Sequence, residues 1–140
     1  MKNKNLPYWI TTILVALAFL AGGASDLARS PQVLEGMQHL GYPDYFATIL
    51  GVWKILGAIA ILAPGFPRLK EWAYAGIFFD LSGAALSHAY SHDPVGKIVT
   101  PLVILGIAAA SWALRSSSAT AAIRSTTPAG RDPSGAFGAS

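Results

Sequence analysis

The chain has 140 residues and a formal net charge of +3, and 53% of its residues are hydrophobic while only 12% are charged. An ordinary soluble domain is about one quarter charged, so this composition excludes such a domain and indicates a single domain embedded in a lipid bilayer. The chain has no cysteine, which excludes disulfides, thiolate-bound metals and iron–sulfur clusters. Its basic residues are too scattered to predict binding to nucleic acid.

Four segments are long and apolar enough to cross a bilayer as helices, which takes about 20 residues each. They cover residues 6–25, 45–63, 72–90 and 98–114. Turns rich in proline and glycine separate the second, third and fourth segments, and such short connections favour antiparallel neighbours. The sequence therefore predicts an all-α fold, a four-transmembrane-helix antiparallel bundle.

The longer connection after the first segment holds a short helix of its own. Ser30 suits the N-cap, Pro31 the first helical position and Gly41 the stop. Four apolar residues of this helix fall on one face: Val33, Leu34, Met37 and Leu40. We therefore expect an interfacial helix that lies along the membrane surface in the first outer loop.

The distribution of lysine and arginine predicts that both termini lie in the cytoplasm, because cytoplasmic segments carry an excess of these residues. In that orientation two basic residues, Arg29 and Lys97, lie in the outer loops. Seven lie in cytoplasmic segments: Lys2, Lys4, Arg68, Lys70, Arg115, Arg124 and Arg131. We expect a multi-pass protein of the cell inner (cytoplasmic) membrane.

The N-terminus has an alternative interpretation as a secretory signal peptide. Lys2 and Lys4 precede an apolar stretch and a run of small residues at 22–25. Cleavage would leave three spans. We favour a retained helix, because the apolar stretch is long for a signal peptide and its glycines suit helix packing.

The composition changes after residue 115. Residues 116–140 are rich in serine, threonine, alanine, glycine and proline, and they offer too little apolar area to offset the entropy of ordering. We therefore expect a transmembrane domain over residues 1–115 and a disordered cytoplasmic tail over residues 116–140.

Lys54 and Asp80 are charged residues inside predicted spans. Lys54 lies ten residues before Pro64, and Asp80 lies ten residues after Lys70. At 1.5 Å per residue both fall about 15 Å from the same membrane edge, near the midplane. An unpaired charge there costs about 2.5 to 3.5 kcal/mol, and the small residues on both helix faces permit close approach. We expect Lys54 and Asp80 to pair, either as a binding site or as a contact that only fixes helix register.

His88 is a secondary candidate. His88 and His92 are spaced i, i+4 and Asp93 follows, which suits a metal if the helix continues. Ser91 and Pro94 indicate that the helix ends there, so we predict no metal site, a polar contact for His88 and a solvated His92. His39 lies in the first outer loop, so we expect no haem ligation.

The predicted outer loops and the adjoining span ends are polar. They carry Asp26, Arg29, His39, Asp44, His88, His92, Asp93 and Lys97. These residues either form a vestibule that leads to Lys54 and Asp80, or are polar simply because the loops are exposed to solvent.

Several motifs resemble the DoxX-like family. They are residues 41–43 (Gly-Tyr-Pro), 50–57 (Leu-Gly-Val-Trp-Lys-Ile-Leu-Gly), 63–64, 71–76, 79–81 and 87–88. The resemblance covers residues 6–115 and implies a four-helix bacterial membrane protein. Relatives include a subunit of a thiosulfate:quinone oxidoreductase and a subunit of a terminal quinol oxidase. Lys54, Asp80 and His88 fall within these motifs, but the resemblance assigns no catalytic role to any of them.

The resemblance suggests an accessory subunit of a quinone-linked redox system, with a quinone or a redox partner subunit as its partner. The sequence has no haem or flavin motif, so we expect no intrinsic cofactor, no catalytic residue and no stand-alone enzyme; a partner would supply the cofactor. Two alternatives remain open. One is a small-solute or proton conduit, and the other is a structural or assembly protein of the membrane.

Overall fold

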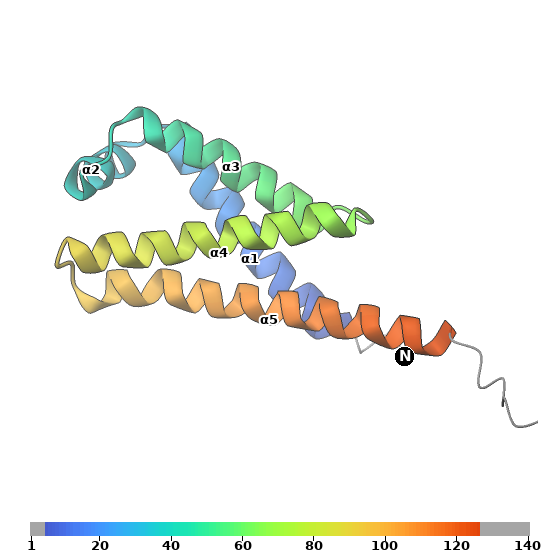
Figure 1. The fold of residues 1–140 in the computed structure, drawn as a ribbon. Coiled ribbons are helices and arrows are strands. Elements are labelled where there is room, and N and C mark those ends of the chain that lie inside the picture. The colour runs from blue at the N-terminus through green and yellow to red at the C-terminus, as the bar shows by residue number, and fades with distance from the viewer. Residues whose placement is uncertain (1–4, 127–140) are drawn as a thin grey trace, which may run out of the picture.

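The computed structural model describes residues 5–126, and this part of the chain is helical without strands (Figure 1). The helices are α1 (Leu6–Leu27), α2 (Pro31–Leu40), α3 (Tyr45–Leu62), α4 (Pro67–Tyr90) and α5 (Val95–Thr126). The predicted all-α class is therefore confirmed for the described residues.

Three helices are long and apolar enough to cross a membrane: α1, α3 and the Val95–Ser116 part of α5. The helix α4 is less apolar, because polar residues such as Asp80 and His88 interrupt it. Large apolar side chains on α1, α3 and α5 point outward, among them Leu17, Leu56 and Val103, which are 52% to 57% exposed. An apolar surface of this extent is expected against lipid rather than water.

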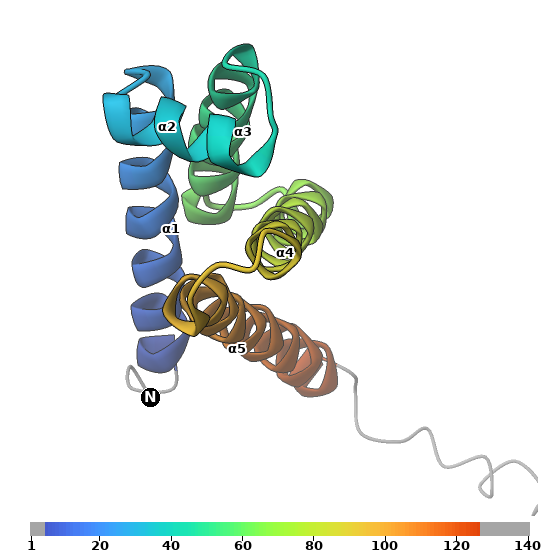
Figure 2. The ribbon, with the colours of Figure 1, turned by 90° about the vertical axis from the view of Figure 1, so that its left-hand side faces the viewer.

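The helices form two antiparallel pairs that cross each other, α1 with α3 and α4 with α5 (Figure 1). Figure 2 shows that α1 also touches α5 and that α4 lies between α3 and α5. The buried core lies where the four long helices meet. It contains Val15, Ala16, Phe19, Ala58, Ile61, Tyr74, Ile77, Leu81 and Ala108.

Two glycines bring the backbones of α1 and α3 into close contact. A Cβ on Gly23 would lie 3.0 Å from the carbonyl oxygen of Gly51, and a Cβ on Gly51 would lie 2.9 Å from that of Gly23. Real Cβ atoms do not approach backbone this closely, so the contact requires glycine on both sides. Small residues commonly permit such backbone contact between membrane helices.

The short helix α2 has the predicted bounds. It begins with Pro31 after Ser30 and ends before Gly41, whose φ of 81° is a left-handed conformation that glycine adopts without strain. No residue of α2 is buried.

The last helix is longer than predicted. We expected it to end at residue 114, but α5 continues to Thr126. The segment after Arg115 contains several alanines, which have the highest helix propensity, and the Ser116 hydroxyl donates to the Trp112 carbonyl at 3.1 Å within the helix. Of the predicted disordered tail, residues 116–126 are therefore helical, and residues 127–140 lie outside the described residues.

Candidate functional site

Lys54 forms an ion pair between α3 and α1. Its ammonium donates a hydrogen bond to Oδ2 of Asp26 at 2.9 Å, and the two side chains are 22% and 8% exposed. The Lys54 side chain forms no ion pair with Asp80, so the predicted direct pairing of Lys54 with Asp80 is wrong. The cause is the Gly23–Gly51 contact, which brings α1 against α3 and places Asp26 within reach of the lysine.

The Lys54 ammonium and the Lys54 backbone lie at different levels along α3. Lys54 lies nine residues after the start of α3, about 14 Å along the helix axis. Asp26 lies one residue before α1 ends. The lysine stem passes Gly22, whose added Cβ would lie 3.8 Å from Lys54 Cδ. The ammonium therefore lies closer to the α2 end of the molecule than the Lys54 backbone does, as long basic side chains often do at membrane depth.

Asp80 approaches this ion pair from α4. It is partly buried and lies within electrostatic range of both Lys54 and Asp26. Within residues 5–126 its carboxylate makes no hydrogen bond or ion pair. We call Asp26, Lys54 and Asp80 the intramembrane cluster, after the spans that the sequence predicts around Lys54 and Asp80. The cluster combines two carboxylates with one ammonium and leaves the Asp80 oxygens open to a further group.

The glycines beside Asp80 do not pack tightly. We expected small residues on α3 and α4 to let these two helices approach closely, but an added Cβ on Gly57, Gly76 or Gly83 would meet no atom within 4 Å. Gly76 and Gly83 lie one turn before and one turn after Asp80. There is open space next to the Asp80 face of α4.

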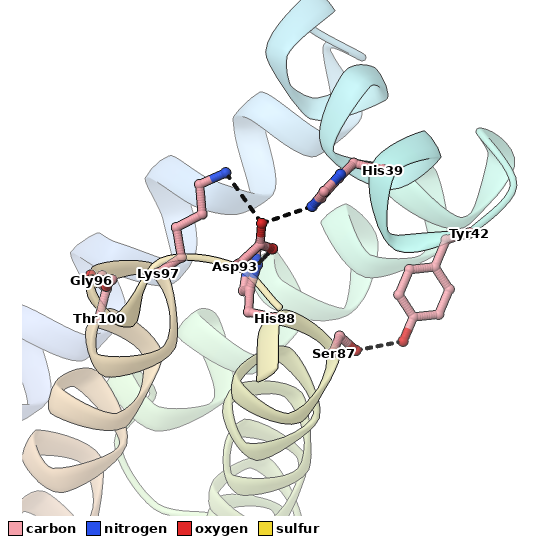
Figure 3. Close-up of polar contacts among 8 residues, drawn as sticks. All are labelled: His39, Tyr42, Ser87, His88, Asp93, Gly96, Lys97 and Thr100. Carbon is pink, nitrogen blue, oxygen red and sulfur yellow. Dashed lines mark hydrogen bonds and ion pairs between the residues drawn. The ribbon is translucent and has the colours of Figure 1, made fainter. Parts of the chain in front are cut away.

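A second group of polar side chains surrounds Asp93 in the turn between α4 and α5 (Figure 3). Asp93 Oδ2 lies 2.7 Å from Nδ1 of His88, and Oδ1 lies 2.8 Å from Nε2 of His39 and 3.9 Å from the Lys97 ammonium. The Asp93 side chain is 6% exposed. The hydrogen bond to His88 holds the pKa of Asp93 below its ordinary value, with further help from His39 and Lys97 against an opposing effect of burial.

We call His39, His88, Asp93 and Lys97 the Asp93 cluster. It joins the last turn of α2 to the α4–α5 turn. Next to it the Tyr42 hydroxyl lies 2.8 Å from Ser87 Oγ, which attaches the loop before α3 to α4 (Figure 3). The polar residues expected at this end of the molecule are thus partly organised into contacts between helices.

His88 makes a polar contact, as predicted, but with Asp93 of the adjoining α4–α5 turn and not with another helix of the bundle. The helix α4 ends at Tyr90, and His92 is exposed with a φ of 55°. His88 and His92 therefore do not share a helix face, although their spacing is i, i+4. In the described part of the chain, no group of three or more histidine, aspartate or glutamate side chains is arranged to hold a metal ion.

A chain of buried hydroxyls joins three helices and was not predicted. Ser111 Oγ on α5 lies 2.6 Å from Thr12 Oγ1 on α1 and 2.7 Å from the Tyr74 hydroxyl on α4. Thr12 and Ser111 are fully buried. Isolated hydroxyl residues have no characteristic spacing, and the only available signal was their position inside apolar segments.

Asp26 was also assigned incorrectly, because its place after the apolar segment indicated an outer loop. The helix α1 instead continues through Leu27, and Asp26 is buried. A signal was present in the sequence, since Asp26 follows Gly22 and Gly23 at i+4 and i+3 and therefore shares their helix face.

Comparisons with known proteins agree with the motifs. The sequence profile of the DoxX-like family matches residues 10–111. The chain is 33% identical over 78 residues to the uncharacterized protein YdgD of Bacillus subtilis (strain 168), a match that covers 56% of this chain and 68% of that protein. No solved structure matches the chain significantly. The family and the three apolar helices fit an integral membrane protein. The chain belongs to the DoxX-like family.

Proposed function

We propose that this protein spans the bacterial inner membrane four times and binds the head group of a quinone at the intramembrane cluster, as an accessory subunit of a quinone-linked redox system. The observation that carries the proposal is Asp80, a partly buried carboxylate in the middle of α4 that has no direct partner in the described chain and lies beside an ion pair; in the proposed topology it lies within the membrane. Ionisable groups at such depth are costly and are commonly functional.

The proposed topology has both termini in the cytoplasm, α4 as the third span and α2 along the outer surface. The excess of lysine and arginine in the N-terminal segment, in the first turn of α4 and in the C-terminal segment supports this orientation. The helix α2 supports its surface position, because none of its residues is buried and its apolar residues share one face.

The chemistry of the intramembrane cluster suits a quinone. A quinone carbonyl accepts hydrogen bonds, and a quinol hydroxyl also donates them. The Lys54 ammonium has three donors, of which Asp26 takes one, and Asp80 can accept from a quinol or donate when protonated. The open space at Gly76 and Gly83 would admit a ring beside Asp80. Electrons would pass through a cofactor held by a partner subunit.

Binding of a water-dispersible ubiquinone or menaquinone analogue to the purified protein in neutral detergent tests this proposal. Saturable binding to the wild type that weakens about tenfold in Asp80→Asn would support it, since a hydrogen bond to a charged group contributes about 1.5 to 3 kcal/mol. Glu35→Gln on the exposed face of α2 is the matched control. Absence of saturable binding to the wild type would refute the quinone assignment.

A second candidate function is a conduit for protons or a small solute. It is favoured by titratable groups at two levels of the molecule, the Asp93 cluster at the α2 end and the intramembrane cluster deeper along α3 and α4. Flux in reconstituted vesicles that is lost in Lys54→Met but kept in Glu35→Gln, on the exposed face of α2 outside both clusters, would support a conduit.

The third candidate is a purely structural or assembly role. It is favoured by the Asp26–Lys54 ion pair, which lies beside the Gly23–Gly51 contact and could serve only to fix the register of α1 and α3. If the protein keeps full function after both charged residues of the ion pair are replaced by apolar residues, the structural role would be the one that remains.

A further inference from the structure

A cavity of about 360 Å³ opens at the end of the molecule where α1 and α4 begin, far from α2. Its polar lining comes from three helices: Asn5 and Tyr8 at the start of α1, Lys70 in the first turns of α4 and Arg115 on α5. Trp9 also lines the cavity. Its ring packs edge to face against the ring of Tyr8, with 5.3 Å between the ring centroids. The volume lies within the usual range for small-ligand sites.

Lys70 is the unusual residue of this cavity. It is 8% exposed, and its ammonium forms no hydrogen bond or ion pair with any residue of the range 5–126. The other strongly buried charged side chains are paired, Asp26 with Lys54 and Asp93 with His88. Among the described residues no side-chain nitrogen is both sealed from solvent and without a partner, so the Lys70 ammonium still reaches solvent, and the residue lines the cavity. A cation on a largely buried side chain without a charged partner favours an anion from outside the described chain.

The neighbouring charges do not supply that anion. The nearest acid in the sequence is Glu71, but its carboxylate is engaged by the Arg115 guanidinium and by the Trp112 indole, which donates at 2.9 Å. Arg115 also donates to the Pro67 carbonyl at 2.9 Å. A guanidinium has five donors, so Arg115 retains donors beyond these two contacts. The cavity therefore combines an unpaired ammonium with further donors, and none of its lining residues within 5–126 carries a carboxylate.

The surroundings of the cavity are apolar. Leu6 and Ile10 on the same helix are 55% and 50% exposed, and tyrosine and tryptophan are the aromatic residues that gather at membrane–water interfaces. A ligand here meets cationic donors on one side and a lipid-facing helix surface on the other. A phosphodiester that carries acyl chains has this combination of a charged group and apolar tails.

We propose that this cavity binds the phosphate of a phospholipid head group, with the Lys70 ammonium as its main partner and Arg115 and Tyr8 as additional donors. The inference is separate from the quinone proposal, because the cavity and the intramembrane cluster share no residue. The site is a lipid position on the protein, not a reaction centre.

Amine labelling of the wild-type protein tests the site without a substitution. The delipidated protein in a maltoside detergent is treated with an amine-reactive ester, with and without a short-chain phosphatidylglycerol, and labelling is read by peptide mass spectrometry. We expect the lipid to protect Lys70 and to leave Lys97 unchanged, since the Lys97 side chain is 58% exposed at the other end of the molecule. Equal labelling of Lys70 with and without lipid would overturn the proposal.

Variants and a soluble ligand complete the test. The affinity for the same lipid, followed by tryptophan fluorescence, should fall about tenfold in Lys70→Met, stay near the wild-type value in Lys70→Arg and be unaffected in Lys97→Met. An unchanged affinity in Lys70→Met would count against the site. Inorganic phosphate at the same concentration should not protect Lys70; protection equal to that by the lipid would identify a soluble phosphate site and overturn the lipid assignment.

Discussion

Gly23 of α1 and Gly51 of α3 face each other so closely that a Cβ on either residue would lie 2.9 or 3.0 Å from the carbonyl oxygen of the other. This backbone contact decides which charged residues meet. It places Asp26 beside Lys54 and leaves Asp80, on the more distant α4, as the unpaired member of the intramembrane cluster.

Gly23→Ala should destabilise the protein by about 1 to 3 kcal/mol, the usual cost of overpacking a tight contact, and lower the thermal midpoint measured in detergent. Gly57→Ala is the matched control on α3, because an added Cβ there meets no atom within 4 Å, and alanine favours the helix by about 1 kcal/mol. An equal midpoint in Gly23→Ala and Gly57→Ala would contradict the backbone contact.

Lys54→Met should cost roughly 2 kcal/mol, because it leaves the buried Asp26 carboxylate without its partner. Asp26→Leu in the same chain should recover most of that loss. Double-mutant cycles from thermal or denaturant unfolding should give a larger coupling energy for Lys54 with Asp26 than for Lys54 with Asp80. The reverse order would restore the pairing of Lys54 with Asp80 that the sequence suggested.

Asp80→Asn should raise the thermal midpoint while it weakens quinone binding. The substitution removes a charge that has no direct partner in the described chain. In the proposed four-span topology this carboxylate lies within the membrane, where a lone charge costs about 2.5 to 3.5 kcal/mol. Opposite effects on stability and binding are typical of residues kept for function. A drop in both quantities would show instead that Asp80 supports the fold.

Ser111→Ala should lower the unfolding free energy by about 1 to 3 kcal/mol, since the fully buried Thr12 hydroxyl loses the partner it contacts at 2.6 Å. The Tyr74 hydroxyl loses its contact as well. Ser82→Ala on α4 is the control and should change stability little, because within the described residues the Ser82 hydroxyl donates to the Phe79 carbonyl of its own helix and to no other helix. Similar stabilities of the two variants would argue against the buried hydroxyl chain.

The Asp93 cluster should lose its contribution to stability in acid. The pKa of Asp93 is lowered from its ordinary 3.8, so its ionised form stabilises the folded state fully above that value and progressively less as the pH falls through the lower folded-state pKa. The thermal midpoint of the wild type, compared with that of Asp93→Asn, should therefore show a difference at pH 6 that shrinks below about pH 4. If the difference in thermal midpoint between the wild type and Asp93→Asn grew as the pH fell, it would contradict a lowered pKa of Asp93.

Local signals predicted much of the fold. Apolar length identified α1, α3 and α5, while the turns rich in proline and glycine on either side marked α4, which is less apolar. Ser30, Pro31 and Gly41 gave the bounds of α2, because caps and breakers act within one turn. The end of α5 was missed, since serine and alanine can continue a helix that is already formed. Composition alone does not distinguish such an extension from an irregular tail.

The site was predicted less well, because its contacts depend on how helices pack. Lys54 was identified as a buried charge, but its partner follows from the Gly23–Gly51 contact, which periodicity does not reveal. The contact between Thr12 and Ser111 joins residues 99 positions apart in the sequence. Hydrophobic patterning gives each helix its buried face and leaves open which neighbour that face will meet.

The extension of α5 has a mechanical consequence. Between Arg115 and Thr126 the helix advances about 16 Å, and Figure 1 shows it projecting past the α3–α4 turn and the start of α1. A helix of this kind is a stiff arm rather than a tether. A protein bound to the C-terminal end of this helix would be held at a fixed distance from the bundle. A displacement or rotation of that end would be transmitted along α5 to Ser111 and the core.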